Sequence, residues 1–573
     1  MKELMLGNQA VARGLYEAGC KVVSSYPGTP STEITEYAAL YDEIFCEWAP
    51  NEKVSLEVSG GAAISGARAF SAMKHVGLNV AADPLFTLSY TGTNAGLVIA
   101  VADDPGMHSS QNEQDSRHYA LASKTMMLEP SDSSECLAFT KLAFELSEKF
   151  DTPVLLRLTT RISHSRSLVE LGERVEKENV EYTKDPGKYV MMPAMARTRH
   201  EIVEKRVLDQ TAWVETCELN KVEYNSKKIG IICSGAPYMY AKEALGENAS
   251  YLKLGCVYPL PVELIKDFAA QCEKVYVIEE LDDYIESHCL KHGVEVIGKS
   301  LFSLLGEYSQ SLIREKILGE KPETLKADIA APGRPPVLCN GCPHRALFYS
   351  LKRLKVFVSG DIGCYTLAAL APLSMMDTCI CMGASVSALH GRNKANPENA
   401  KKSVAVIGDS TFIHSGITGL INIAYNKSDS VVIILDNSIT GMTGHQDNPT
   451  TGKTIKGDPA QSVNLEMLVK AVGIDRVSVI DPNDLENSFK VIKEELEQPG
   501  PGVIISRRPC ALLKYVKHAP PLKVDSEKCT GCKMCMRIGC PSISFRDGKA
   551  IIDQTQCVGC GVCQQLCKFD AIN

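Results

Sequence analysis

Short hydrophobic runs alternate with amphipathic segments along most of this 573-residue chain. Two of the clearest runs, Val404–Ile407 and Val431–Leu435, flank a segment whose apolar residues recur at helical spacing. A strand, a helix and a second strand in this order predict a parallel pair, because a parallel connection needs a crossover. The pattern therefore predicts an α/β protein built from doubly wound parallel sheets.

The N-terminal part of the chain shows the same alternation. Leu4–Ala18 is predicted to be an amphipathic helix, and Lys21–Ser25 a strand that ends in a rigid, proline-containing loop at Tyr26–Glu33. Val54–Val58 is predicted to be a further strand. It leads into Ser59–Ala69, whose small residues predict a helix that packs closely on a neighbour.

Composition changes and proline-rich stretches divide the chain into five parts. Ala331–Pro336 is rich in proline and predicts a linker between two α/β regions. We expect the following bounds: an α/β domain at 1–165, a charged connecting segment at 166–228, a second α/β domain at 229–330, a third at 331–518 and a small α+β domain at 519–573.

Composition and charge argue against several classes of protein. Hydrophobic residues make up 45% and charged residues 23% of the chain, as in globular proteins. A net charge of −8 argues against a nucleic-acid-binding protein, which usually carries a basic excess. No apolar run is long enough to span a membrane, and Met1–Gly19 lacks the uninterrupted hydrophobic core of a secretory signal. We therefore expect a cytoplasmic protein.

The C-terminal segment carries the most specific motif. Eight of the 22 cysteines fall between Cys529 and Cys567, in two C-x-x-C-x-x-C groups that each have a trailing cysteine. This is the arrangement of a two-cluster ferredoxin, in which the trailing cysteine of each group ligates the other cluster. Structural zinc sites use different spacing. The expected [4Fe–4S] ligands are Cys529, Cys532, Cys535 and Cys567 for one cluster and Cys557, Cys560, Cys563 and Cys540 for the other.

Polar residues follow both strands of the central strand–helix–strand unit. Asp409 comes after the first strand and Asn437 follows the second. A carboxylate, an amide oxygen and a main-chain carbonyl are hard ligands that suit Mg²⁺ bound to a diphosphate. Gly441, Gly444 and Gln446 belong to a loop flexible enough to let main-chain N–H groups approach phosphate. The alternative is an ordinary sheet unit with an Asp helix cap and an Asn turn.

This unit resembles the diphosphate-binding motif of thiamine diphosphate enzymes, in which a Gly-Asp-Gly start is followed by an Asn. Here the start reads Gly408, Asp409, Ser410, so a serine replaces the second glycine. The resemblance implies that the cofactor is thiamine diphosphate. It also implies that Asp409, Asn437 and the carbonyl oxygen of Ile439 ligate Mg²⁺.

The N-terminal domain resembles the pyrimidine-binding domain of 2-oxoacid:ferredoxin oxidoreductases, which carry a similar Y-P-x-T-P-S loop. The resemblance implies that Thr29 faces the substrate and that Glu57 contacts the aminopyrimidine ring, where a carboxyl group favours the tautomer that removes a proton. It also implies that Arg117 pairs with the substrate carboxylate, since a guanidinium binds a carboxylate bidentately. The alternatives are a surface glutamate and a solvated loop with surface charges.

Four further cysteines admit two interpretations. Cys339 and Cys342 form a C-x-x-C pair, Cys364 follows, and Cys510 lies much further along the chain. In several members of the same superfamily, cysteines in a similar arrangement hold an additional [4Fe–4S] cluster beside the thiamine. The alternative is a thiol-lined loop that shapes the cofactor site.

The resemblance covers nearly the whole chain, and its domain order and length match the large subunits of indolepyruvate oxidoreductases. It implies oxidative decarboxylation of arylpyruvates such as indolepyruvate to aryl-acetyl-CoA and CO₂, with reduction of ferredoxin. Coenzyme A and a separate beta subunit in an α₂β₂ assembly are implied as partners. Two alternatives stay open: a non-redox thiamine-dependent arylpyruvate decarboxylase, and an electron-transfer subunit with a degenerate thiamine site.

Overall fold

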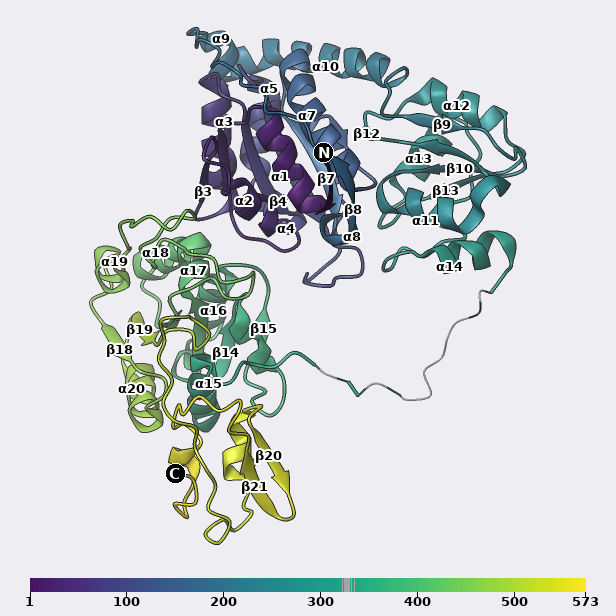
Figure 1. Ribbon diagram of the computed structural model, residues 1–573. Helices are drawn as coiled ribbons and strands as arrows, with labels where there is room; N and C mark the ends of the chain where they lie inside the picture. The colour runs from purple at the N-terminus through teal and green to yellow at the C-terminus, as the bar shows by residue number, and fades with distance from the viewer. Residues whose placement is uncertain (322, 324–329, 331, 334) are drawn as a thin grey trace. The chain divides into compact units, whose positions relative to one another are not determined.

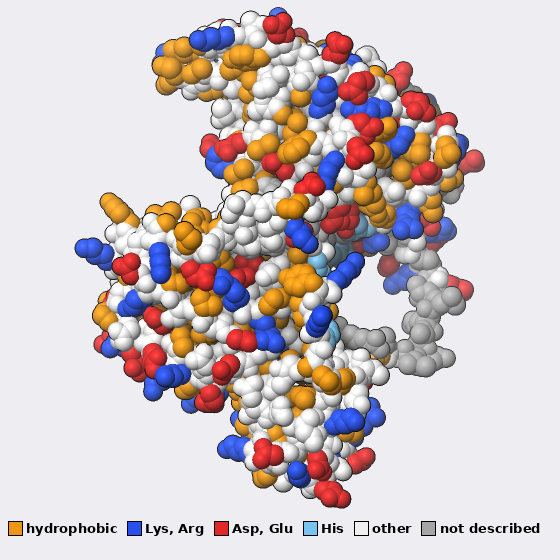
Figure 2. Space-filling model, turned by 60° about the vertical axis from the view of Figure 1, so that its left-hand side comes forward, with side chains coloured by type: hydrophobic (Ala, Val, Ile, Leu, Met, Phe, Trp, Pro, Cys, Tyr) orange, Lys and Arg blue, Asp and Glu red, His pale blue; other side chains and the backbone are white. Residues whose placement is uncertain are grey.

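The computed structural model describes residues 1–321, 323, 330, 332–333 and 335–573, which belong to two compact units, Met1–Asp328 and Ile329–Asn573 (Figure 1). The predicted linker Ala331–Pro336 lies partly outside the described residues, because 331 and 334 are not among them. Basic and acidic side chains are interspersed on the faces that Figure 2 shows. Among the helices of the described residues, none has the length and apolar composition that crossing a membrane requires.

The first unit contains, among its described residues, a seven-stranded sheet with the order β12-β6-β7-β5-β4-β2-β3. All neighbouring strands are parallel except the pair β12–β6. Its central strands are buried along their whole length, as expected for a parallel sheet covered by helices. The strands are β2 (Val22–Ser25), β3 (Phe45–Trp48), β4 (Ala69–Lys74), β5 (Leu97–Asp103), β6 (Met127–Leu128), β7 (Val154–Thr159) and β12 (Cys256–Tyr258).

Helices pack against this sheet and against one another. The small-residue helix α3 packs on β2 and β4, and α1 packs on α2 and α7. The helices of this domain are α1 (Gly7–Glu17), α2 (Thr32–Ala38), α3 (Glu52–Ile64), α4 (His75–Val80), α5 (Ala82–Thr91), α6 (Arg117–Ser123), α7 (Ser133–Phe150) and α8 (Thr160–His164).

Three elements differ from the prediction near the N-terminus. The predicted helix Ser59–Ala69 is the second half of α3, which ends at Ile64, and Ala69 is the first residue of β4. The predicted helix Leu4–Ala18 begins only at Gly7, because Lys2–Leu6 is a strand, β1, that pairs antiparallel with β8 (Arg166–Glu170). The predicted strand Val54–Val58 is wrong, since these residues lie inside α3. The side chain of Asn51 caps that helix by accepting from the N–H of Val54 at 2.9 Å, and this cap outweighs the strand preference of the two valines, Val54 and Val58.

The second α/β domain of the first unit is confirmed as a parallel structure. Its strands have the order β13-β10-β11-β9, and only β9 runs antiparallel. The predicted connecting segment holds β8 and a long helix, α10. The bounds are β9 (Lys221–Glu223), β10 (Gly230–Cys233), β11 (Ser250–Lys253), β13 (Val275–Ile278), α9 (Pro186–Tyr189), α10 (Pro193–Val214), α11 (Gly235–Leu245), α12 (Val262–Ala270), α13 (Tyr284–Lys291) and α14 (Gln310–Ile313).

The second unit is organised around a wholly parallel sheet with the order β15-β14-β16-β17-β19-β18 in its described residues. The predicted strand–helix–strand unit is confirmed, with β16 paired to β17 in the register Val404 to Val431. The elements are β14 (Phe357–Gly360), β15 (Thr378–Cys379), β16 (Ser403–Gly408), β17 (Val431–Asp436), β18 (Val477–Ile480), β19 (Gly502–Arg507), α15 (Pro343–Leu354), α16 (Ala384–Ala395), α17 (Asp409–Thr411), α18 (Ile417–Tyr425), α19 (Leu465–Ala471) and α20 (Leu485–Glu497).

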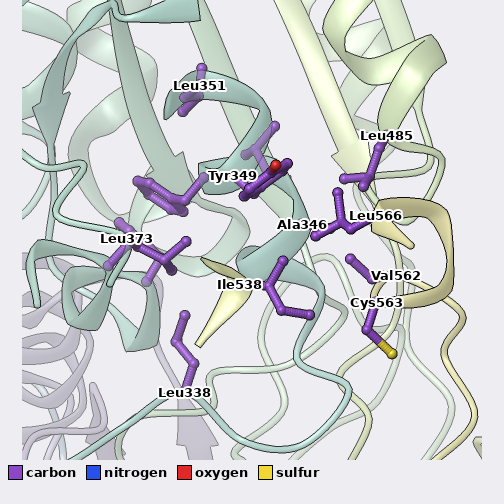
Figure 3. Close-up of a cluster of buried hydrophobic side chains, with 14 of the residues drawn as sticks. Leu338, Ala346, Tyr349, Leu351, Leu373, Leu485, Ile538, Val562, Cys563 and Leu566 are labelled. Carbon is purple, nitrogen blue, oxygen red and sulfur yellow. The ribbon is translucent and has the colours of Figure 1, made fainter. Parts of the chain in front are cut away.

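The cysteine-rich tail forms a small domain with one antiparallel hairpin, β20 (Ile543–Arg546) and β21 (Lys549–Ile552). Its buried residues join those of the preceding domain in one hydrophobic cluster, where Ile538 and Leu566 of the tail pack with residues such as Ala346 (Figure 3). A shared core holds the tail at a fixed place on the larger domain.

Candidate active site

The carboxyl ends of β16 and β17 bring three predicted oxygen ligands together. Asp409 and Asn437 are 2% and 8% exposed. The terminal amide of Asn437 places one of its two atoms 3.0 Å from the carbonyl oxygen of Ile439 and 3.3 Å from Oδ1 of Asp409. Hydrogen bonding favours the nitrogen at this position, where it donates to both oxygens. A bound cation would instead draw the amide oxygen toward the same place, and a carboxylate, an amide oxygen and a carbonyl oxygen are ligands that suit Mg²⁺.

The electrostatics of Asp409 agree with a cation site. Burial, together with the nearby Asp436 carboxylate, raises the pKa of Asp409 to about 7. Its Oδ1 accepts from the N–H of Ser410 at 2.7 Å. A bound cation would offset the burial of the ionised carboxylate, which is otherwise costly.

The predicted phosphate loop follows β17 directly. The N–H of Thr440 donates to the carbonyl oxygen of Gln446 at 3.0 Å, which closes the loop. Gly444 has a φ of 125°, a conformation that favours glycine. The amide of Gln446 is buried and donates to the carbonyl of Thr443 at 3.0 Å, so this side chain shapes the loop. The N–H of Gly408 donates to the hydroxyl of Tyr365 at 3.0 Å.

Four cysteines far apart in sequence meet beside this loop. The N–H of Cys510 donates to the carbonyl oxygen of Asn437 at 2.9 Å. Burial raises the pKa of Cys342 to about 12, with further contributions from the thiols of Cys364 and Cys339. Burial likewise raises the pKa of Cys364 to about 11, with contributions from Cys510 and Cys339. Cys364 and Cys510 lie against the loop, since a Cβ on Gly441 would be 3.4 Å from Sγ of Cys364 and Sγ of Cys510 is 3.8 Å from Nε2 of His445. The N–H of Cys342 donates to the carbonyl oxygen of Cys339 at 3.1 Å, which holds the C-x-x-C pair together.

Each predicted ligand set of the tail lines a pocket of its own. One pocket is bordered by Cys540, Cys557, Cys560 and Cys563. The other is bordered by Cys529, Cys532, Cys535 and Cys567. The trailing cysteine of each group thus lies with the other group, as the ferredoxin arrangement requires.

The C-x-x-C loop also contacts the first of these pockets. Cys342 borders it, and a Cβ placed on Gly341 would lie 2.2 Å from Cγ2 of Val558. Arg345 ties the two parts together. Its guanidinium donates to the carbonyl of Ile538 at 2.9 Å and to that of Cys339 at 3.1 Å.

In the first unit, Thr29 lies at the carboxyl edge of the sheet. It is half-buried and follows β2, and its carbonyl oxygen accepts from the hydroxyl of Ser109 at 3.4 Å. Ser109 belongs to the loop after β5, so two loops from neighbouring parts of this edge meet at Thr29.

Glu57 does not stand at the head of the small-residue helix. It lies in the second turn of α3, exposed to solvent, and its carboxylate pairs with Lys53. The residue at the helix start is Glu52, which is 5% exposed and packs closely against Gly77, where a Cβ would lie 2.6 Å from its Oε1. The sequence signal that indicates Glu52 is Asn51, a residue type favoured at helix N-caps, because a cap there makes Glu52 the first residue of the helix.

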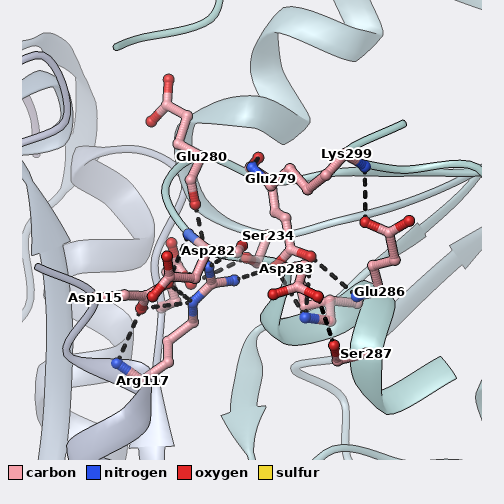
Figure 4. Close-up of polar contacts among 12 residues, drawn as sticks. Asp115, Arg117, Ser234, Glu279, Glu280, Asp282, Asp283, Glu286, Ser287 and Lys299 are labelled. Atoms are coloured by element: carbon pink, nitrogen blue, oxygen red, sulfur yellow. Dashed lines mark hydrogen bonds and ion pairs between the residues drawn. The ribbon is translucent and has the colours of Figure 1, made fainter. Parts of the chain in front are cut away.

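Arg117 is buried in a network of protein acceptors, and this geometry does not support pairing with a substrate carboxylate (Figure 4). Its guanidinium donates to both carboxylate oxygens of Asp115 at 2.5–3.1 Å. It also donates to Oε2 of Glu279 at 2.5 Å. The main-chain oxygens of Glu280 and Asp282 accept further bonds at 3.1 and 3.3 Å. Arg117 therefore joins the two α/β domains of the first unit.

Three family models match the chain. They are "Pyruvate flavodoxin/ferredoxin oxidoreductase, thiamine diP-bdg" at residues 13–229, "Thiamine pyrophosphate enzyme, C-terminal TPP binding domain" at 361–506, and "4Fe-4S dicluster domain" at 521–568. Together with the parallel sheets and the paired cysteine pockets, they define a thiamine-diphosphate-dependent oxidoreductase of the 2-oxoacid:ferredoxin superfamily.

Relatives define the family more closely. The chain is 42% identical over 610 positions to indolepyruvate oxidoreductase subunit IorA of Archaeoglobus fulgidus, covering 100% of this chain and 97% of that protein. It is 40% identical over 603 positions to subunit IorA of Methanothermobacter thermautotrophicus, with the same coverage. A solved 2-oxoglutarate:ferredoxin oxidoreductase from Magnetococcus marinus aligns with 19% identity and a TM-score of 0.47, over 56% of this chain and 65% of that one. The chain belongs to the IorA family of indolepyruvate oxidoreductase subunits.

Proposed function

We propose that the chain catalyses the oxidative decarboxylation of arylpyruvates, indolepyruvate foremost, to aryl-acetyl-CoA and CO₂ while electrons pass to ferredoxin. The observation that carries the proposal is the convergence of Asp409, Asn437 and Ile439 at the carboxyl edge of the sheet, in the same unit as two cysteine-lined pockets. The choice of indolepyruvate rests on the names of the relatives.

Residues of the second unit would hold the cofactor. Asp409, Asn437 and the carbonyl oxygen of Ile439 supply three ligands to Mg²⁺, and the main chain around Gly441 and Gly444 approaches the diphosphate. When bound, thiamine diphosphate supplies the carbon nucleophile and the electron sink. The domain's task is to fix that group and to keep the Asp409 carboxylate ionised beside the metal.

Glu52 takes the role that the sequence assigned to Glu57. A carboxyl group that hydrogen-bonds an aminopyrimidine nitrogen must be held in one place and shielded from water. Glu52 meets both needs because it is 5% exposed and lies in the first turn of α3. Glu57 meets neither, since it is exposed and paired with Lys53.

Three groups of cysteines in the second unit would hold the clusters that give electrons a way out of the active site. A cluster at Cys339, Cys342, Cys364 and Cys510 would stand next to the phosphate loop, because a Cβ on Gly441 would lie 3.4 Å from Sγ of Cys364. The next cluster would be held at Cys540, Cys557, Cys560 and Cys563, in the pocket that Cys342 also borders. The last would be held at Cys529, Cys532, Cys535 and Cys567.

Further partners complete the reaction. Ferredoxin accepts the electrons and coenzyme A captures the acyl group. A separate beta subunit in an α₂β₂ assembly is part of this proposal, and its support is that the relatives are named as subunits of an oxidoreductase.

One anaerobic assay tests the proposal. The chain, purified with its partner subunit and loaded with thiamine diphosphate and Mg²⁺, receives indolepyruvate, coenzyme A and a viologen dye. The expected result is dye reduction that needs both substrates. Aldehyde release without dye reduction would indicate a non-redox decarboxylase instead. Failure to retain thiamine diphosphate would indicate an electron-transfer subunit.

A further inference from the structure

Lys74 is a buried cation at the ligand-binding edge of the first unit. It is the last residue of β4, next to β2 and β5, and it is 8% exposed. In parallel sheets, ligands bind outside the carboxyl ends of the strands. Arg117, the cation expected to serve this edge, is bound by protein acceptors instead.

The Lys74 ammonium is adjacent to the Thr29 loop. Its Nζ donates to the carbonyl oxygen of Ser109 at 2.6 Å, and the hydroxyl of Ser109 in turn reaches the carbonyl of Thr29. The stem of Lys74 lies against Gly28, where a Cβ would come within 3.3 Å of Cβ of Lys74. Lys74 and the loop predicted to face the substrate thus share one small region.

The positive charge of Lys74 lacks a carboxylate partner. Among the described residues, no carboxylate lies within ion-pair distance of Nζ. The nearest acidic influence is Asp104, whose oxygens accept from the N–H of Ser109 at 2.9 Å and the hydroxyls of Ser110 and Thr160 at 2.5 and 2.6 Å. Burial lowers the pKa of Lys74 to about 8, against the opposing effect of Asp104. A buried ammonium normally has an anionic partner.

We propose that Lys74 binds the carboxylate of the 2-oxoacid substrate. An ammonium has three N–H donors, and Ser109 accepts from it at its carbonyl oxygen at 2.6 Å and, more weakly, at its hydroxyl at 3.4 Å. The third donor is left for an incoming carboxylate, which can also replace the long contact to the hydroxyl. The substrate would supply the missing negative charge, and the charged form of Lys74 would be stabilised when substrate is bound. This assignment rests on the proposed function, because it names the group that recognises the 2-oxoacid.

The test compares Lys74→Met and Lys74→Arg with a matched control, Lys53→Met. Lys53 is an exposed lysine on α3, 44% exposed at its side chain. In the anaerobic dye assay, Lys74→Met should lower kcat/KM for indolepyruvate about 10- to 100-fold, mainly through KM, as expected for loss of a charge-assisted hydrogen bond. Lys74→Arg should recover part of this loss, and Lys53→Met should behave as wild type.

A pair of substrate analogues separates a binding role from a structural one. Indole propionate carries its carboxylate at the same chain position as indolepyruvate, and indole propionamide is its neutral counterpart. Lys74→Met should weaken inhibition by the propionate by about the same factor and leave inhibition by the propionamide unchanged, with thiamine and iron contents as in wild type. If wild type and Lys74→Met are both active and have equal KM and equal inhibition by the propionate, the assignment of Lys74 alone is overturned. A wild type that oxidises no 2-oxoacid would overturn the proposed function, and Lys74 with it.

Discussion

Replacing Arg117 with methionine should unfold the first unit much more readily while leaving the second unit intact. The side chain of Arg117 is 1% exposed and neutralises two buried carboxylates, Asp115 and Glu279. Although burial opposes ionisation of Asp115, Arg117 and Arg157 hold the pKa of that carboxyl below its usual range. Burial raises the pKa of Glu279, and Arg117 counteracts this effect. Arg117→Met would leave both carboxylates without their main partner.

The expected loss follows from the desolvation of these groups. Removing one member of a buried ion pair costs about 3–5 kcal/mol, because the remaining charge stays buried without compensation. Asp115 retains a longer contact with Arg157, at 3.7 Å, so the larger share of the cost should come from Glu279. The free energy of unfolding of the first unit should therefore fall by about 3–5 kcal/mol.

Tryptophan fluorescence measures this change directly. The two tryptophans of the chain, Trp48 and Trp213, both lie in the first unit, so urea titration of the full-length protein reports that unit. Arg197→Met, an exposed position on α10, serves as the control and should change the unfolding free energy by less than about 0.5 kcal/mol. Normal stability of Arg117→Met combined with a raised KM for the 2-oxoacid would refute the structural role and restore the substrate-binding one.

Three further predictions concern the cofactor residues and one buried acid. Glu52→Gln should lower turnover at least about 100-fold with thiamine still bound, whereas Glu57→Gln should stay near wild type in the dye assay. Cys510→Ser should lose about four iron atoms per chain by chemical iron determination, and Cys381→Ser, an exposed cysteine, should lose none. Burial raises the pKa of Glu280 to about 7. Below pH 4.5 the carboxyl group is protonated in both the folded and the unfolded protein, so it does not lower the free energy of unfolding. As the pH rises through 7 the buried group must ionise, and this stability is lost. Glu280→Gln should therefore exceed wild type in unfolding free energy by up to about 3 kcal/mol at pH 8, and the difference should shrink toward pH 5.

Each of these predictions has a contrary outcome. Equal activity of the two glutamate variants would remove Glu52 from the reaction. Unchanged iron in Cys510→Ser would leave only the two clusters of the tail. A Glu280→Gln protein whose advantage over wild type does not depend on pH would show that Glu280 ionises freely in the folded state.

Local patterns in the sequence were enough to predict much of the second unit. The strand–helix–strand unit around Asp409 has the apolar periodicity of a parallel pair, and the cysteine tail has a spacing that only a few ligand sets satisfy. Both signals are contained in short segments of chain. Cys339 and Cys510 lie near each other although they are far apart in sequence, and the cluster proposed there stays a prediction.

The residues of the first unit were harder to assign for a physical reason. One of the two carboxylate partners of Arg117, Glu279, lies 162 positions away in the sequence, so no local pattern indicates that this pair forms or that it is buried. The valines of Val54–Val58 prefer strands, which predicts a strand there. The Asn51 cap and the small residues of α3 favour instead a helix that packs against the sheet. Lys74 carries no motif, and only its burial without a carboxylate partner distinguishes it from a surface lysine.

The most direct test of the account is whether substrate reduces the iron–sulfur clusters through the Asp409 site. The chain, assembled with its partner subunit and coenzyme A, would be mixed anaerobically with indolepyruvate and frozen for electron paramagnetic resonance. We predict a reduced [4Fe–4S] signal in wild type, and no such signal in Asp409→Ala, which should lose thiamine diphosphate but retain its iron. A wild type whose clusters stay oxidised, or a signal that persists in Asp409→Ala, would contradict the account.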